Sequence, residues 1–337
     1  MVRKTASAGA LLACLLTTAP ALAQDITPWT SDRPDGHAPA GVLVDYLLPK
    51  GDTYFAVRLY QEQFRGTRPG TQPFLFDDVL DFFSVAPLSL DREIVEVEFR
   101  LGLTDWLTLA GSMPGARAEM FSATDAVFFE TTSETIGDVN IRGLVDLLSM
   151  DDYRLSLTLG GTIPTGQTSR SGATPFTPSG TLPFAMQGGS GTYDILAGMT
   201  FLTQNDLASV GAQFNSVIRV FTNSRGYRLG DEFEFSVWGS YQLNDWVSLS
   251  MRGLYQTWGD VTGSDPGTDG TIDPGANSFA QGGERIFIPF GVNLMFREGP
   301  IAGNRLSLEW YYPVHQELHG PQLSAHRTLV MSWQYQF

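Results

Sequence analysis

Apolar and polar residues alternate along most of the chain with a period of two residues. Between Tyr153 and Ile163 every second residue is apolar or glycine, and the residues between them are Arg, Ser, Thr and Gly. This period is typical of β-strands, in which successive side chains point to opposite faces. Residues that favour turns, such as Gly, Asp, Asn and Pro, bound the runs. The pattern predicts twelve strands, at residues 52–62, 92–102, 106–116, 136–147, 153–164, 191–202, 207–220, 232–243, 246–258, 285–297, 304–313 and 326–337.

The connections between these strands alternate between short and long. Short connections follow the second, fourth, sixth, eighth and tenth strands, and they hold only a few residues each. The long ones are residues 63–91, 117–135, 165–190, 221–231, 259–284 and 314–325. Tight turns on the periplasmic side and long loops outside are typical of outer-membrane barrels. Trp106 and Trp246 each follow a short turn, where an aromatic belt at the membrane interface is expected.

The two faces of the predicted strands differ in charge. The central positions of the apolar faces are free of Asp, Glu, Lys and Arg, whereas the opposite faces carry charged residues. A soluble β-sandwich would instead place charged residues on the strand faces that meet water. Lipid outside and water inside a barrel produce the pattern seen here. We therefore predict an all-β transmembrane antiparallel up-and-down β-barrel of about 12 strands, covering residues 52–337 and ending in a C-terminal Phe.

Both ends of the chain favour export to the outer membrane of a Gram-negative bacterium. Arg3 and Lys4 precede a short apolar run, and Ala21-Leu22-Ala23 resembles a small-residue cleavage site, which predicts a signal peptide at residues 1–23. In the last strand Trp333, Tyr335 and Phe337 alternate with polar residues. We expect these three aromatics to be the membrane insertion signal for the barrel-assembly machinery.

Residues 24–51 precede the first strand and are rich in Pro, Gly and Asp. We interpret them as a periplasmic leader or plug segment, whose Val42-Leu43-Val44 run could pack into the mouth of the barrel. The only cysteine, Cys14, lies in the signal peptide, so the mature chain has no disulfide or thiol chemistry. A lipoprotein cleavage before Cys14 is the less favoured alternative, because the better cleavage site lies beyond it.

The net charge is strongly negative. The chain has 21 basic and 36 acidic residues, and loss of Arg3 and Lys4 with the signal would leave 19 basic residues. This balance argues against nucleic acid as a partner. Much of the acidity is in the long loops, where Asp265, Asp269 and Asp273 do not follow the EF-hand spacing. We expect solvated loop carboxylates; divalent cations that bridge to lipopolysaccharide are the alternative.

The inward faces carry acids and arginines in nearly equal number, which argues against a strongly ion-selective pore. Two interpretations stay open: the charges bind or filter a solute, or they pair with one another to stabilise a wet interior. By this register the channel-lining charges are Arg58, Glu62, Glu96, Glu98, Arg100, Arg142, Asp146, Arg154, Asp194, Arg219, Glu232, Glu234, Arg252, Arg305 and Glu309.

The sequence offers little for catalysis. Neither a G-x-S-x-G nor an H-E-x-x-H motif occurs among the residues. An outer-membrane hydrolase would depend on His326, which we place on an inward face with Thr328, or on Glu96. We expect no catalytic site, no cofactor and no bound metal.

Several stretches resemble a known family. They are His37-Ala38-Pro39-Ala40-Gly41-Val42, Ile163-Pro164-Thr165-Gly166, Gly189-Ser190-Gly191-Thr192-Tyr193-Asp194, Arg225-Gly226-Tyr227-Arg228-Leu229-Gly230-Asp231, Gly320-Pro321-Gln322-Leu323 and Trp333-Gln334-Tyr335. Together they resemble the bacterial outer-membrane transporter barrels of the MetA-pathway-of-phenol-degradation family. The resemblance implies uptake of small aromatic or hydrophobic compounds.

These observations predict an outer-membrane channel that passively conducts small molecules, among them aromatic or hydrophobic ones. Loops 63–91, 165–190 and 259–284 would gate a narrow polar lumen. The alternative is a plugged structural or adhesion barrel with cation-binding acidic loops. The expected partners are outer-membrane lipid, lipopolysaccharide and a small-molecule solute.

Overall fold

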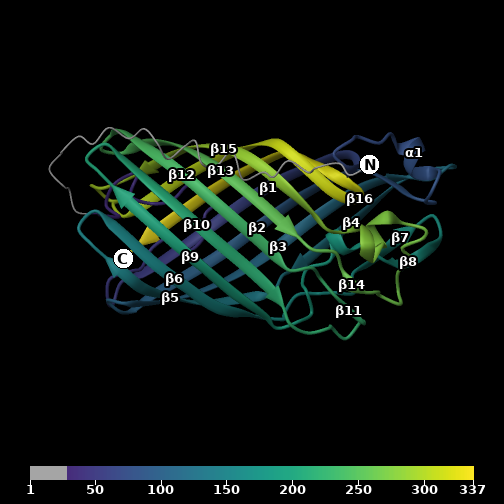
Figure 1. Ribbon diagram of the computed structural model, residues 1–337, viewed down its shortest axis with the longest axis horizontal. Coiled ribbons are helices and arrows are strands. Elements are labelled where there is room, and N and C mark those ends of the chain that lie inside the picture. Colours follow the sequence, from purple (N-terminus) through teal and green to yellow (C-terminus); the bar gives the residue numbers. More distant parts are fainter. Residues whose placement is uncertain (1–28) are drawn as a thin grey trace, which may run out of the picture.

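The computed structural model describes residues 29–337, which form a barrel of antiparallel strands (Figure 1). The predicted signal peptide and Cys14 lie outside the described residues. Among residues 29–337 no helix is long and apolar enough to span a membrane. The short elements of the connections, such as α1, β7, β8 and β14, gather at one end of the barrel in Figure 1. The all-β barrel prediction is confirmed.

The wall is built from long strands. Their bounds are β1 (Thr53–Gly70), β2 (Ala86–Thr104), β3 (Leu107–Ala123), β4 (Phe128–Ile136), β5 (Val139–Ser149), β6 (Tyr153–Ile163), β9 (Asp194–Gln204), β10 (Ala208–Arg219), β12 (Glu232–Asn244), β13 (Val247–Trp258), β15 (Gly283–Met295) and β16 (Asn304–Gln336). The connections hold α1 (Phe76–Leu80), β7 (Ser171–Thr174), β8 (Thr177–Thr181), β11 (Tyr227–Arg228), β14 (Thr262–Gly263) and the 3-10 turns η2 (Phe184–Met186), η3 (Pro274–Ala276) and η4 (Ser278–Ala280).

The ring closes because β2 pairs with both β1 and β3, and only β4 lies outside the closed ring. β16 pairs with β15 through its first half and with β1 through its second half. Since β1 and β15 run in opposite directions, the chain must reverse within β16, near Gly320, whose φ is +71°. β4 and β5 follow one another along β3 and together make one crossing. The chain therefore runs along the barrel wall from one end to the other twelve times, as predicted.

The exposure of the side chains follows the predicted faces. On β6, Leu159 and Ile163 are exposed on the outside, whereas Ser156 and Thr158 are buried inside. On β13, Met251 is 58% exposed and its neighbour Arg252 is 1% exposed. An apolar outer surface of this extent needs a hydrocarbon surrounding, because in water it would drive aggregation.

Met251→Arg is expected to destabilise the barrel by about 2–4 kcal/mol, because it places a charge in the hydrocarbon layer. Phe279→Arg is the control: Phe279 is 85% exposed but lies in η4 of a loop, where a charge should change stability by less than about 0.5 kcal/mol. Urea unfolding of both variants in lipid vesicles measures the difference. Equal effects would contradict the assignment of the outer face of β13 to lipid.

Two of the predicted long loops, 117–135 and 314–325, are largely strand, so those predictions are wrong, and a third, 63–91, is shorter than predicted. Most of 117–135 belongs to β3 and β4, all of 314–325 belongs to β16, and the two ends of 63–91 belong to β1 and β2. Beyond the membrane the outward positions become charged, as in the cross-strand pairs Glu93↔Arg117 and Arg117↔Glu134. Backbone pairing continues there, but the apolar alternation that marks a lipid-facing strand stops. The wall therefore extends further outside than the alternation indicated.

Candidate functional site: a lumen divided by a plug segment

The described part of the N-terminal segment, residues 29–51, lies inside the barrel, and we call it the plug segment. Its even-numbered residues Ala38, Ala40, Val42, Val44, Tyr46 and Leu48 are each less than 5% exposed. Val42, Tyr46 and Leu48 pack in one cluster with Tyr54, Leu202 and Trp238 of the wall, and Val44 packs with Ala110 and Leu144 in another. The segment is thus in contact with several sides of the lumen.

Side chains of the wall satisfy the backbone of the plug segment. Backbone N–H and C=O groups buried outside regular structure need such partners. The Arg58 Nε donates to the Ala40 carbonyl (3.2 Å), and Gln213 Nε2 donates to the Leu43 carbonyl (2.9 Å). The Leu48 N–H donates to Thr108 Oγ1 (2.8 Å). These contacts come from β1, β10 and β3, so the segment is held from different parts of the ring.

A buried ion-pair network joins the plug segment to the wall. Glu98 on β2 accepts hydrogen bonds from both Arg58 and Arg100, and all three are at most 1% exposed. Arg100 also donates to Asp45 of the plug segment (3.0 Å) and lies over the Tyr54 ring at 4.3 Å. The network links the plug segment, β1 and β2 through alternating charges.

A second network surrounds Gly41. Arg252 pairs with Glu309 (3.0 Å) and also donates to the Tyr311 hydroxyl, and the Gly41 N–H donates to Glu309 Oε2 (2.9 Å). A Cβ at position 41 would overlap the Tyr311 hydroxyl and approach Arg252 Nη2 to 2.7 Å. Only glycine fits this close approach.

The structure places the remaining predicted lumen charges as follows. Asp194, Arg219 and Glu232 form a third network, in which Arg219 donates to both acids. Arg305 is 2% exposed and donates to the carbonyls of His37 and Ala38. Glu62 pairs with Arg92 (2.6 Å), Glu96 accepts from Tyr60 (3.5 Å), and Glu234 accepts from Gln256 (2.9 Å). Asp146 accepts from Ser149 (2.7 Å), and Arg154 lies 5.5 Å from the Trp29 ring. The side chain of Arg142 makes no hydrogen bond or ion pair with any residue of 29–337.

A cavity of about 680 Å³ lies between the plug segment and the long loops at one end of the barrel. Its lining joins Gly41, Leu43 and Val44 of the plug segment to loop residues such as Pro183 and Pro274. Much of the remaining wall is apolar, namely Phe64, Leu90, Met120, Phe287, Leu323 and Ala325. Of the predicted channel-lining charges, Glu62, Arg142, Glu232 and Glu234 line this cavity. The lumen is thus an outward cavity above a filled section, with most of its charges paired.

Sequence reasoning missed several residues of this site. Asp45 and Gly41 lie in a segment without strand periodicity, so the apolar alternation could not predict that they contact Arg100 and Glu309. Arg285 begins a predicted strand on the face opposite Ile286, and that register alone could have added it to the inward set. The placement of His326 on an inward face is wrong, because the register shifts between Phe64 and its neighbour and leaves His326 exposed while Thr328 is buried.

Asp273, which lines the cavity, has a pKa that burial raises to about 6. As the pH rises through 6 this carboxyl gains a negative charge, so we expect cation preference to increase between pH 5 and pH 7.5. Asp273→Asn should remove that step. Asp269→Asn is the control, because hydrogen bonds from Thr271 lower the pKa of exposed Asp269 and keep it ionised. Reversal potentials in planar bilayers measure the effect; an unchanged step in Asp273→Asn would contradict it.

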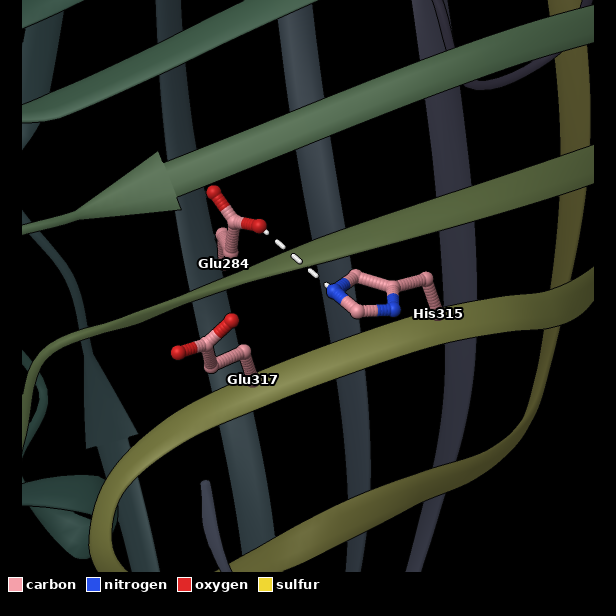
Figure 2. A group of neighbouring side chains, drawn as sticks. All are labelled: Glu284, His315 and Glu317. Atoms are coloured by element: carbon pink, nitrogen blue, oxygen red, sulfur yellow. Dashed lines mark ion pairs between the residues drawn. The ribbon is translucent and has the colours of Figure 1, made fainter. Parts of the chain in front are cut away.

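Glu284, His315 and Glu317 form a separate group on β15 and β16 (Figure 2). Their ligand atoms lie within 4.8 Å of one another. The His315 Nε2 is 3.5 Å from Glu284, and the Tyr255 hydroxyl donates to Glu284 (2.7 Å). Carboxylate and imidazole groups of this kind can bind a divalent metal, but the His315–Glu284 pair and the tyrosine already account for the arrangement of Glu284.

The fold is similar to that of a solved outer-membrane channel. The COG4313 outer membrane channel from Pseudomonas putida F1 matches with a TM-score of 0.62 and 15% identity, over 88% of this chain and 99% of that chain. The P. putida toluene transporter TodX matches with a TM-score of 0.45 and 10% identity, over 86% and 91%. The Ralstonia pickettii toluene transporter TbuX matches with a TM-score of 0.41 and 11% identity, over 92% and 98%.

The match to the COG4313 channel shows that this chain has the fold of an outer-membrane channel. A search of curated proteins found no match. The model of the family described as "putative MetA-pathway of phenol degradation" matches residues 41–298, from the plug segment into the turn that follows β15. This match confirms the resemblance drawn from the sequence, and the chain belongs to this family.

Proposed function

We propose that the protein is a passive channel for small apolar or aromatic molecules, which enter the cavity from outside and leave past the plug segment. The observation that carries this proposal is the cavity of about 680 Å³ with its largely apolar wall. Pockets for small ligands commonly have a volume of this order and an apolar lining. The family description, which names phenol degradation, supports an aromatic solute.

Uptake of a radiolabelled neutral aromatic by Gram-negative cells tests the proposal. Whole cells are needed because such molecules cross phospholipid vesicles unaided, whereas the lipopolysaccharide leaflet slows them. Cells with the wild-type barrel should take up the solute faster than cells with Ala325→Trp, which fills the cavity from its wall. Equal uptake by both, with equal amounts of folded barrel, would contradict a route through the cavity.

A closed structural barrel is the second candidate, because the plug segment is held by buried hydrogen bonds and ion pairs. The two candidates differ in the flux of solute that they predict for the wild type. In a channel, the segment limits a flux that is already measurable. In a structural barrel, the wild type has no flux and only damaged variants leak.

Gly41→Val is expected to increase ion conductance several-fold, because the new side chain would overlap the Tyr311 hydroxyl and displace the plug segment. Gly253→Val is the matched control, since a Cβ at Gly253 meets no atom within 4 Å. Planar-bilayer recordings of the two variants and the wild type provide the comparison. Wild-type conductance in Gly41→Val would show that the segment is not the restriction.

We further propose that the barrel-assembly machinery inserts the protein after removal of the signal peptide, and that lipopolysaccharide surrounds its outer rim. Trp333 is 40% exposed and Phe337 is 62% exposed, and Tyr335 stacks on Phe337 with ring centroids 5.3 Å apart. Aromatic side chains on the outside of the last strand are available to a receptor before the barrel closes.

A further inference from the structure

Arg285 on β15 lines the cavity and makes no direct ion pair with a carboxylate of residues 29–337; the nearby Glu62 is paired with Arg92. Its guanidinium lies 4.7 Å from the Trp258 ring and 5.2 Å from the Phe64 ring. Its Nη2 donates to the Leu323 carbonyl (3.2 Å), whereas its Nε is buried without a partner. No carboxylate of residues 29–337 forms an ion pair with it. Arg285 is the one cavity-lining residue in the described chain with a buried polar side-chain atom that lacks a hydrogen bond.

Most other arginines of the lumen are neutralised. Arg58 and Arg100 share Glu98, Arg252 has Glu309, Arg219 has Asp194, and Arg92 has Glu62. Arg142 is the other cavity-lining arginine without a carboxylate partner, and it lies on β5, across the ring from β15. A guanidinium away from bulk water is stabilised by a paired anion. The cavity thus keeps two arginines without a carboxylate partner, whereas most arginines elsewhere in the lumen have one; Arg305, which donates to the carbonyls of His37 and Ala38, is an exception.

The carboxylates of the cavity are already engaged. Glu62 is bound by Arg92, Glu232 by Arg219, Glu234 by Gln256, and Asp273 by the Gly275 N–H. The buried atom of the lining that lacks a hydrogen-bond partner is instead a donor, the Arg285 Nε, and the Arg142 guanidinium has no side-chain partner within residues 29–337. A ligand that supplies a planar or tetrahedral anionic group would satisfy these donors.

Apolar side chains surround the same guanidinium. Phe64, Phe287 and Leu323 belong to one buried cluster, and all three line the cavity with Arg285. This combination of an apolar wall and an unpaired cation suits a molecule with an apolar body and an anionic head. We propose that the cavity binds aromatic organic anions, such as carboxylates or sulfonates, with the anionic group on Arg285. The inference rests on the proposed function and names the charge class of its solute.

Benzenesulfonate and phenyltrimethylammonium test the inference, because they are similar in size and stay ionised at all working pH values. Isothermal titration calorimetry of the detergent-solubilised full chain should detect benzenesulfonate binding but no binding of the cation. Arg285→Gln should weaken benzenesulfonate binding about tenfold or more, because the charge-assisted hydrogen bonds to the sulfonate are lost. Arg285→Lys should retain part of the affinity. Arg297→Gln, which removes an exposed arginine outside the cavity, should bind as the wild type does.

Flux into proteoliposomes gives the second readout, with benzenesulfonate expected to enter faster than the cation and Arg285→Gln to abolish the difference. Unchanged binding in Arg285→Gln, or equal affinity for anion and cation, would overturn the inference. If neutral aromatics still enter cells through the cavity while benzenesulfonate does not bind, the proposed function stands and this inference fails. If neither compound enters, both fail.

Discussion

Deleting residues 25–50 is expected to raise the single-channel conductance several-fold or more. In the wild type the buried side chains of the plug segment fill the lumen between the wall strands below the cavity. Each wall strand keeps its backbone partners without the segment, because the ring is closed by strand pairing alone. The exposed lumen groups, including Arg100 and Glu309, would then be hydrated instead of buried. A barrel that stays folded and gains conductance is the expected result in planar bilayers.

A matched control replaces residues 25–50 with a Gly/Ser segment of the same length, which cannot form the buried contacts of Asp45 or Tyr46. It should conduct like the deletion if the contacts, and not the length of the chain, close the lumen. If the deletion and the Gly/Ser replacement both conduct no more than the wild type, the segment does not close the lumen.

Glu98→Gln is expected to destabilise the barrel by about 3–5 kcal/mol, because removing one partner leaves a buried charge uncompensated. Glu98 accepts from both Arg58 and Arg100, and the three side chains are at most 1% exposed. Glu119→Gln is the control: Glu119 pairs with Arg117 at the surface, where such pairs contribute about 0–1 kcal/mol. Urea unfolding in lipid vesicles measures both.

The cost of Glu98→Gln should fall in the chain that lacks residues 25–50, because water then reaches Arg58 and Arg100. The same cost with and without the plug segment would contradict the view that this segment buries the network. The double comparison therefore connects the stability of the network to the position of the plug segment.

The wall was predictable from sequence because hydrocarbon imposes one rule on every strand. Leu159 and Met251 had to be apolar, while Ser156 and Arg252 on the opposite face did not. Where the wall extends beyond the membrane this rule no longer applies. The apolar alternation therefore did not predict the ends of β2 and β3, where Glu93 pairs with Arg117. The alternation of apolar and polar residues indicates where a strand faces lipid, and it does not indicate strands that face water on both sides.

The interior of the barrel was less predictable, because its contacts join distant parts of the chain. Asp45 and Arg100 are 55 residues apart, and Gly41 and Glu309 are 268 residues apart. Their pairing depends on the register of the closed ring and on the path of an irregular segment, neither of which has a local signal. The sequence allows the lumen charges either to pair with one another or to bind a solute, and the structure places most of them in ion-pair networks. Arg285 lies outside these networks, and only the structure shows that it lines the cavity.

Labelling of single cysteines in the plug segment tests most directly whether it divides the lumen. Leu43 lines the cavity on the loop side of the segment, whereas Leu47 lines a separate pocket of the lumen with Asp146 of β5 and Arg154 of β6. Cys14, in the predicted signal peptide, is the only cysteine of the chain, so a Cys14→Ser background lets Leu43→Cys and Leu47→Cys be labelled singly. A small membrane-impermeant thiol reagent added outside intact cells should modify Leu43→Cys and spare Leu47→Cys. Equal modification of both from outside would contradict a lumen divided by residues 29–51.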